Sequence, residues 1–284
     1  MQNAAPDALL IGTHTYAASG DAAERQAAGL ESLARLDRAQ IVDLQFADAP
    51  HHVDRVETLA VLRKDSRTVS RRDGPRKGIV SEIFDVLAAE ARRRGIRYCC
   101  FTNADIIWSQ AAVDWILASG KEACILSRRD VDGAHEKGIE LAGLDAVAID
   151  ASWWPRHRHR FRDYIVGEIC WDNSYTAILM CHADAALENR RGLIRHQVHA
   201  SASHSAFGDY IRYLAALDAG YFHLWCRYWE QLLAMRQRGA PASDEERLAR
   251  EVFVWRPTPG ARLLQAARNV KARLRYAASR LGIR

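Results

Sequence analysis

The residues best suited to chemistry are Asn103 and Asp105, which follow the apolar run of residues 96–101. A run of this kind, bounded by Gly95 and preceded by a helical pattern, indicates a buried strand of an α/β sheet. Ligands bind outside the carboxyl ends of such strands, and a carboxylate there can hold a divalent cation that neutralises a diphosphate. Asn103 offers only a neutral carbonyl oxygen, so Asp105 would be the main ligand. The alternative is an Asn/Asp turn that ends the strand and caps a helix beginning near Ser109.

A second carboxylate, Asp172, stands next to Trp171 just before an apolar helical segment, residues 175–180. An apolar neighbourhood raises the pKa of a carboxyl group, which suits it to act as a general base. Asp172 is therefore a candidate base. The alternative is that Asp172 only caps the N-terminus of the helix.

Three histidines, His196, His199 and His204, lie close together later in the chain. Imidazole is a common metal ligand, so each could bind a cation. Their spacing matches no zinc motif, and we therefore do not expect an independent zinc site.

Glycine and threonine follow the first apolar run, residues 8–11. Gly12 would let the backbone approach a ligand closely, and the hydroxyl group of Thr13 could contact a base or a ribose. A simple strand-to-helix turn would explain the same residues.

Two basic segments could contact phosphate groups. Lys77 ends a polar, basic loop, residues 63–77, and Arg129 belongs to a polar cluster that follows the apolar run of residues 123–126. Basic loops above a cleft often bind phosphates, whereas a loop that is simply solvated would have the same composition.

Elements that could position these residues alternate along the first part of the chain. We expect strands at residues 8–11, 40–46, 56–62, 96–101, 123–126 and 144–149, with helices between several of them, one starting at a capping box of Asp21 and Glu24. Alternation of this kind predicts an α/β fold with a mostly parallel central sheet flanked by helices. The chain contains neither G-x-G-x-x-G nor a Walker A loop, which argues against a dinucleotide oxidoreductase and a P-loop enzyme.

The last part of the chain is helical in pattern. An aromatic-rich segment, residues 207–236, is followed by residues 261–284, which carry seven Lys and Arg residues and no Asp or Glu. A basic amphipathic helix can lie on an anionic membrane, or it can dock on its own domain with its cations in water. We expect a domain over residues 1–206 and a helical C-terminal extension over residues 207–284.

The composition is that of an ordinary globular protein: 284 residues, 49% hydrophobic and 26% charged, with a formal charge of +5. A basic balance fits an anionic substrate, a membrane surface or nucleic acid. Six cysteines without C-x-x-C spacing, and an N-terminus without a secretory pattern, lead us to expect a cytoplasmic protein.

The order of four short segments resembles GT-A-type glycosyltransferases, in particular a loosely characterised bacterial group. The matching segments are Asn103-Ala104-Asp105-Ile106, Gly143-Leu144-Asp145, Trp171-Asp172-Asn173 and His196-Gln197-Val198-His199 with Ser203-His204. The resemblance covers roughly residues 8–206 and implies a single Rossmann-related domain.

The resemblance implies roles for several residues. Asp105 would bind Mn²⁺ or Mg²⁺ with His196 or His199, Asp172 would be the base, and Thr13 would lie near the nucleotide. The family carries a second Asp where this chain has Asn103. The further substrate-binding candidates are Gly12, Lys77, Arg129, Asp145 and Trp171.

The implied function is transfer of a sugar from a nucleotide-diphosphate sugar to a glycan or lipid-linked hydroxyl acceptor, in bacterial cell-surface glycan or polysaccharide synthesis. An anionic membrane surface is a further expected partner, through the C-terminal helix at the inner membrane. Two alternatives are a nucleotidyltransferase and a non-catalytic or degenerate nucleotide- or nucleic-acid-binding protein. The sequence has no nucleic-acid recognition signature, which argues against the nucleic-acid partner.

Overall fold

A mixed sheet forms the centre of the computed structural model, which describes residues 8–54, 56–70, 74–199 and 205–282. The strands lie in the order β10-β6-β9-β4-β1-β2-β3, and all are parallel except β9, which is antiparallel to both of its neighbours. Their bounds are β1 Leu9–Thr13, β2 Ala39–Phe46, β3 Glu57–Leu62, β4 Tyr98–Thr102, β6 Ala123–Leu126, β9 Ala146–Asp150 and β10 Ala185–Glu188. The prediction of an α/β fold with a mostly parallel sheet is confirmed.

A second, four-stranded sheet has the order β5-β11-β7-β8. Strand β11 is antiparallel to β5 and parallel to β7, and β7 forms an antiparallel pair with β8. The bounds are β5 Ile106–Trp108, β7 Arg128–Asp132, β8 His135–Glu140 and β11 Ile194–Gln197. The sequence analysis expected none of these strands, nor β10.

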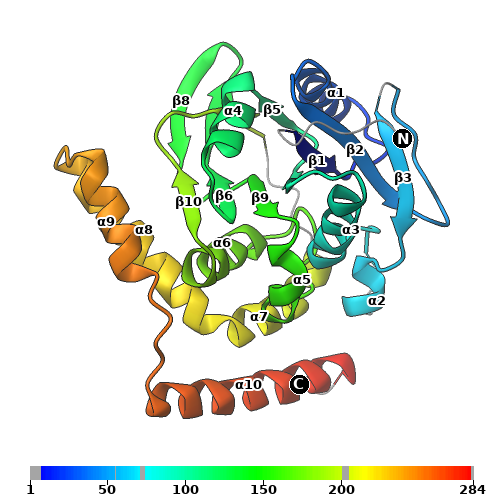
Figure 1. The fold of residues 1–284 in the computed structure, drawn as a ribbon. Helices are drawn as coiled ribbons and strands as arrows, with labels where there is room; N and C mark the ends of the chain where they lie inside the picture. The colour runs from blue at the N-terminus through cyan, green and yellow to red at the C-terminus, as the bar shows by residue number, and fades with distance from the viewer. Residues whose placement is uncertain (1–7, 55, 71–73, 200–204, 283–284) are drawn as a thin grey trace.

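Helices cover both faces of the main sheet (Figure 1). One face packs against α1 and α4 through a core that includes Leu33, Val113 and Ile116. The other face packs against α3, α5 and α6, and this larger core extends to the C-terminal helices. These helices are α1 Asp21–Ala34, α3 Val80–Arg93, α4 Gln110–Ala118, α5 Trp153–His157 and α6 Trp171–His182, with the short α2 Ser66–Ser70 and the 3-10 turn η1 Arg158–Arg160.

The C-terminal part is helical, as expected, but the aromatic-rich segment forms two helices. After the 3-10 turn η2 (Ser205–Phe207), the helices are α7 Gly208–Leu217, α8 Ala219–Gln237, α9 Ala242–Val252 and α10 Pro259–Arg280. Phe207, Tyr210 and Trp225 belong to the same core cluster as Phe101 of the main sheet. Helix α10 lies along α7 at the edge of the molecule (Figure 1). A domain boundary at residue 206 remains a prediction.

The structure differs from the sequence analysis in three local details. Strand β1 continues through Gly12 and Thr13, so these residues lie within the strand. Helix α1 has Gly20 at its N-cap, and Asp21 makes no side-chain cap. The last strand of the α/β alternation, β9, runs antiparallel, because the chain enters it from β8 of the second sheet and not through a crossover helix.

Within the described part of the chain, we find no helix that has both the length and the apolar character needed to cross a bilayer.

Candidate active site

A cavity of about 810 Å³ lies at one edge of the main sheet. The segments after β1, β4 and β6 reach it, together with the segment that leads into β9 and the start of α6. The parallel strands present their carboxyl ends here, which is where ligands bind in open α/β sheets. The predicted site residues that line it are Lys77, Asn103, Asp105, Asp145, Trp171, Asp172, His196 and His199.

Asp105, His196 and His199 meet at one side of the cavity. Asp105 lies in the tight turn between β4 and β5, where the amide of Ile106 donates to the carbonyl of Asn103 at 3.3 Å. Because His196 of β11 pairs with Ile106 of β5, the sheet register places its ring beside this turn. His199 Nε2 lies 3.2 Å from Asp105 Oδ2 and 3.1 Å from His196 Nε2.

The donor set of these three residues fits a divalent cation. One carboxylate oxygen and two imidazole nitrogens lie within 4.8 Å of one another. Manganese, iron and zinc all accept imidazole and carboxylate ligands. Burial alone would raise the pKa of Asp105, but hydrogen bonds and charge from His196 and His199 outweigh burial and hold that pKa below its usual value. Asp105 is therefore ionised at neutral pH, as a metal ligand must be.

Asp130 supports the histidine side of this group. Its Oδ1 lies 3.3 Å from His196 Nδ1, on the side of the ring opposite the nitrogen that faces Asp105. A carboxylate in this position fixes the orientation of a metal-binding imidazole and increases its basicity. The sequence analysis did not single out Asp130.

Arg128 connects the group of Asp105, His196 and His199, through Asp130, to Asp145, which also lines the cavity. Its guanidinium donates to Asp130 Oδ1 at 2.8 Å and to Asp145 Oδ2 at 2.6 Å. Burial alone would lower the pKa of Arg128, but the two carboxylates raise it above its ordinary value, so the side chain stays charged. Asn103 Nδ2 donates to the other oxygen of Asp145 at 2.8 Å. Asn103 thus holds Asp145 in place, and the described metal-type group does not include it.

Asp172 lies at the start of α6, where the chain turns sharply. Cys170 occupies the N-cap with a φ of 80° and the helix has no side-chain cap, so Asp172 is not the cap. Asp172 Oδ2 accepts a hydrogen bond from the Leu144 amide at 3.4 Å. Burial, followed by the charge of Asp145, raises the pKa of Asp172 to about 7. A carboxyl group with this pKa can accept a proton near neutral pH.

Lys77 and Glu168 form an ion pair at the cavity wall, with Lys77 Nζ 2.6 Å from Glu168 Oε1. The backbone brings the two together, because Ile79 pairs with Ile165 and the amide of Val166 donates to the carbonyl of Gly78 at 3.0 Å. Glu168 is buried. This ion pair holds the positively charged Lys77 ammonium group at the wall of the cavity.

Several cavity residues had no place among the predicted site residues. Arg128 lines the cavity and its neighbour Arg129 does not. Arg129 instead pairs with Glu136 at 2.9 Å. Successive side chains of a strand point to opposite faces, so this choice follows from β7 once it is known to be a strand. The other charged, polar-chain and aromatic cavity residues missed are His14, Tyr16, Arg25, Gln26, Arg76, Glu140, Glu168 and Asn173.

Gly12 and Thr13 do not line the cavity. A Cβ atom at Gly12 would lie 2.5 Å from Leu87 Cδ2, so this glycine makes room for α3 and not for a ligand. Thr13 is fully buried, and its hydroxyl oxygen has no hydrogen-bond partner among the described residues. His204 lies outside the described residues.

Comparison with known proteins gives structural likenesses at low identity. No protein-family model and no curated protein matches the chain. The crystal structure of S. aureus TarS is 11% identical, with a TM-score of 0.45, over 74% of this chain and 39% of TarS. The mannosyltransferase PcManGT from Pyrobaculum calidifontis, in complex with GDP-Man and Mn²⁺, is 13% identical, with a TM-score of 0.43, over 96% of this chain and 78% of PcManGT. The glycosyltransferase GlyE of Streptococcus pneumoniae TIGR4 is 10% identical, with a TM-score of 0.34, over 68% of this chain and 55% of GlyE.

The chain therefore spans less than two thirds of the length of TarS and GlyE. Two of these three structures are described as a mannosyltransferase and a glycosyltransferase. Because all three TM-scores are below 0.5, the functional proposal is based on the residues of the cavity.

Proposed function

We propose that this protein is a glycosyltransferase that moves a sugar from a nucleotide-diphosphate sugar to a hydroxyl group of an acceptor. One observation carries the proposal. A single cavity contains a cation-type donor set, Asp105 with His196 and His199, and also a carboxyl group, Asp172, whose pKa is raised to about 7. The first group suits the diphosphate of a donor, and the second suits the hydroxyl of an acceptor.

Asp172 would act as the base. As the acceptor oxygen attacks the anomeric carbon, its proton passes to an oxygen of Asp172 and the nucleoside diphosphate leaves with the electron pair of the broken C–O bond. With a pKa of about 7, a large fraction of Asp172 is ionised at neutral pH, and the group still has a useful affinity for a proton. Asp145, held by Arg128 and Asn103, keeps a negative charge nearby that favours this transfer.

The donor diphosphate would lie between the metal-type group and the basic rim. A divalent cation bound by Asp105, His196 and His199 would supply charge neutralisation for the diphosphate. Lys77, fixed by Glu168, and Arg76 line the same cavity and provide further positive charge. Fixed charges in a partly enclosed site stabilise developing negative charge more strongly than mobile charges in water.

The expected acceptor is a hydroxyl group of a glycan or a lipid-linked sugar, in the synthesis of a bacterial surface glycan or polysaccharide. The cavity volume of about 810 Å³ is within the range for a substrate of this size. Mn²⁺ and Mg²⁺ are the cations to test first, and GDP-mannose belongs among the donors because PcManGT is in complex with it.

The decisive experiment is a thermal-shift screen of the purified protein with UDP-, GDP-, dTDP- and CMP-sugars, each with Mn²⁺, Mg²⁺ or EDTA. A ligand that binds only the folded state raises the melting temperature. We expect one nucleotide to give a shift that increases with metal and is lost in Asp105→Ala. Donor hydrolysis or transfer, followed by release of nucleoside diphosphate, then identifies the reaction.

Two results would overturn the proposal. Release of pyrophosphate from a nucleoside triphosphate would identify a nucleotidyltransferase. No shift with any nucleotide sugar at millimolar concentration, with or without metal, would indicate a non-catalytic protein.

A further inference from the structure

Helix α10 exposes an apolar stripe on the side that faces away from the protein. Leu263, Val270, Leu274 and Leu281 are 73%, 57%, 66% and 75% exposed. Their spacing of seven, four and seven residues places the first three along one side of the helix, and Leu281, its C-cap, continues the line. Four large aliphatic side chains therefore form a continuous line in contact with water.

The opposite side of α10 is the one that docks on α7. Ala272 is buried, and the ring of Tyr276 stacks on Tyr213 with centroids 4.6 Å apart. Gln265 Nε2 donates to the carbonyl of Leu217 at 3.2 Å. Docking thus fixes the rotation of α10 and leaves its apolar stripe outward.

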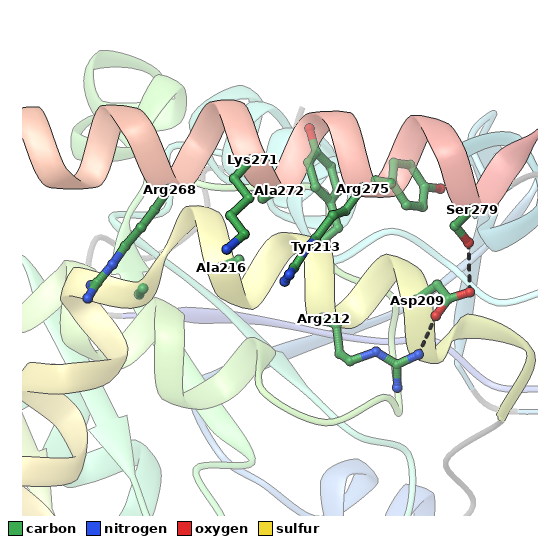
Figure 2. A pocket seen from close by; sticks show the side chains of 11 residues that line it. Asp209, Arg212, Tyr213, Ala216, Arg268, Lys271, Ala272, Arg275 and Ser279 are labelled. Atoms are coloured by element: carbon green, nitrogen blue, oxygen red, sulfur yellow. Dashed lines mark hydrogen bonds and ion pairs between the residues drawn. The ribbon is translucent and has the colours of Figure 1, made fainter. Parts of the chain in front are cut away.

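Cations extend from two sides of α10. Arg268, Lys271 and Arg275 extend from α10 toward α7, into a groove of about 460 Å³ (Figure 2). Among the described residues none of these three has a carboxylate within ion-pair distance, whereas Arg212 on the α7 side pairs with Asp209. The helix contains no Asp or Glu, and its other flank carries Arg262, Arg273 and Arg280.

We propose that α10 is an interfacial helix that docks this protein on the surface of a bilayer containing anionic phospholipids. The apolar stripe would enter the boundary between headgroups and acyl chains, and Arg262, Arg273 and Arg280 beside it would contact lipid phosphates. An apolar face bordered by Lys and Arg, with low overall hydrophobicity, is the pattern of helices that lie in a membrane surface. The inference does not depend on the proposed transfer reaction, because none of these residues lines the cavity.

A second copy of the chain is the competing occupant of this surface. Leu263, Ala267, Val270, Leu274, Ala277 and Leu281 follow the spacing of a coiled-coil seam. Two features argue against it. Lys271, Arg273 and Arg280 border the seam with no acidic partner, so two copies would bring like charges together. The two alanines also leave little apolar area for a helix–helix contact. An anionic surface would instead neutralise these cations.

The test is co-sedimentation of the full chain with two kinds of vesicle, phosphatidylcholine alone and an equal mixture of phosphatidylcholine and phosphatidylglycerol. We expect binding to the mixed vesicles that weakens as salt rises. Each Lys or Arg near such a surface is worth about 1 kcal/mol, so the triple variant Arg262→Glu, Arg273→Glu, Arg280→Glu should lose roughly 100-fold or more in partition coefficient. Val270→Asn with Leu274→Asn should also lose binding, with the charge unchanged.

The matched control reverses the charge of three exposed arginines elsewhere in the C-terminal part: Arg227→Glu on α8, Arg238→Glu just after α8, and Arg250→Glu on α9. This control has the same net charge as the triple variant of α10 and should retain binding. Circular dichroism melting checks that each variant is folded. Nucleotide-sugar binding should be the same in all variants, which separates failure of this inference from failure of the proposed function.

Three outcomes would overturn the inference. They are no binding to mixed vesicles, equal binding to neutral vesicles, and equal loss in the control variant. Light scattering after size-exclusion chromatography tests the competing occupant. A dimer that dissociates in the Val270→Asn, Leu274→Asn variant, without vesicle binding, would assign the stripe to a second copy.

Discussion

His199 Nε2 lies 3.2 Å from Asp105 Oδ2, although 94 residues separate them in the chain. The contact depends on two short strands, because β5 carries the chain away from Asp105 and β11 returns beside it. His196, which lies on β11 itself, completes a group of three side chains around one point. Asp105 follows a strand of the main sheet, and the second sheet brings the two histidines to it.

Replacing Asp105 tests the cation site directly. Asp105→Asn removes the only carboxylate of the described group while conserving size, so the site loses its negative charge. A cation that stabilises the leaving diphosphate contributes several kcal/mol, so we expect kcat/KM to fall about 1,000-fold. Titration calorimetry with Mn²⁺ measures the loss of binding without turnover. Asp132→Asn, an exposed carboxylate of β7, is the control and should change neither quantity.

Asp130 is expected to act through His196. Asp130→Asn should weaken metal binding by about 10- to 100-fold, because the imidazole loses the carboxylate that orients it. Turnover at saturating metal should recover in large part, which separates a supporting role from direct contact with substrate. The same low rate at every metal concentration would contradict this role.

The raised pKa of Asp172 should affect both the stability of the protein and its catalytic rate. In the folded protein this pKa is about 7, against about 4 in an unfolded chain, so the ionised form opposes folding. That penalty is absent below about pH 4, grows as pH rises to 7, and is full above it. Asp172→Asn should therefore increase the free energy of unfolding at pH 8 by up to about 4 kcal/mol, a rise in Tm of up to about 10 °C, with no gain near pH 4.

The same substitution should remove the base. We expect kcat/KM of Asp172→Asn to fall by about 100- to 10,000-fold, and the wild-type rate to rise with pH through an inflection near 7. Denaturant melts at several pH values, measured beside a pH–rate profile, give both results. A variant that is less stable at pH 8, or a flat profile between pH 6 and 8, would exclude Asp172 as the base.

Lys77 is expected to contribute to binding of the donor, and its ion pair with Glu168 to the stability of the fold. Lys77→Met is expected to lower kcat/KM by about 10- to 100-fold, mainly through a higher KM for the donor. It also leaves the buried Glu168 without this cation, so stability should fall. Adding Glu168→Gln should restore much of the stability and none of the activity. Recovery of both together would assign the pair a purely structural role.

Gly12 is predicted to be a packing residue. In Gly12→Ala the new methyl group would press on Leu87 of α3, which is fully buried, at a cost of about 1 to 3 kcal/mol. A double-mutant cycle with Leu87→Ala should show that the two changes are coupled, because the smaller side chain leaves room for the methyl group. If Gly12→Ala weakened donor binding without loss of stability, Gly12 would instead be a ligand-binding residue.

Local pattern was enough to find the strand before Asp105, because an abrupt change from apolar to polar residues marks the end of a buried strand. The pairing of Asp105 with the histidines was not local. Strand β5 has three residues and β11 has four, too few to show a period of two. Which of Arg128 and Arg129 lines the cavity could not be read from the sequence for the same reason, since it required β7 to be known as a strand.

The sequence pattern also did not indicate that β9 runs antiparallel to its neighbours. Its apolar residues 146–149 suit either direction, and what decides the direction is the hairpin of β7 and β8 that delivers the chain to the cavity edge. Asp145 consequently stands before its strand, whereas Asp105 follows the one beside it.

The reversed strand also has a consequence for how the protein folds. Because β9 runs away from the cavity, it ends on the opposite side of the sheet. Residues 151–170 must therefore return to the cavity before α6 can begin there. This return segment carries Glu168, opposite Lys77, and ends at Cys170, two residues before Asp172. Contacts between residues distant in the chain form slowly, because loop closure must come first. In a refolding experiment we therefore expect helical signal to recover early and the cavity to assemble last.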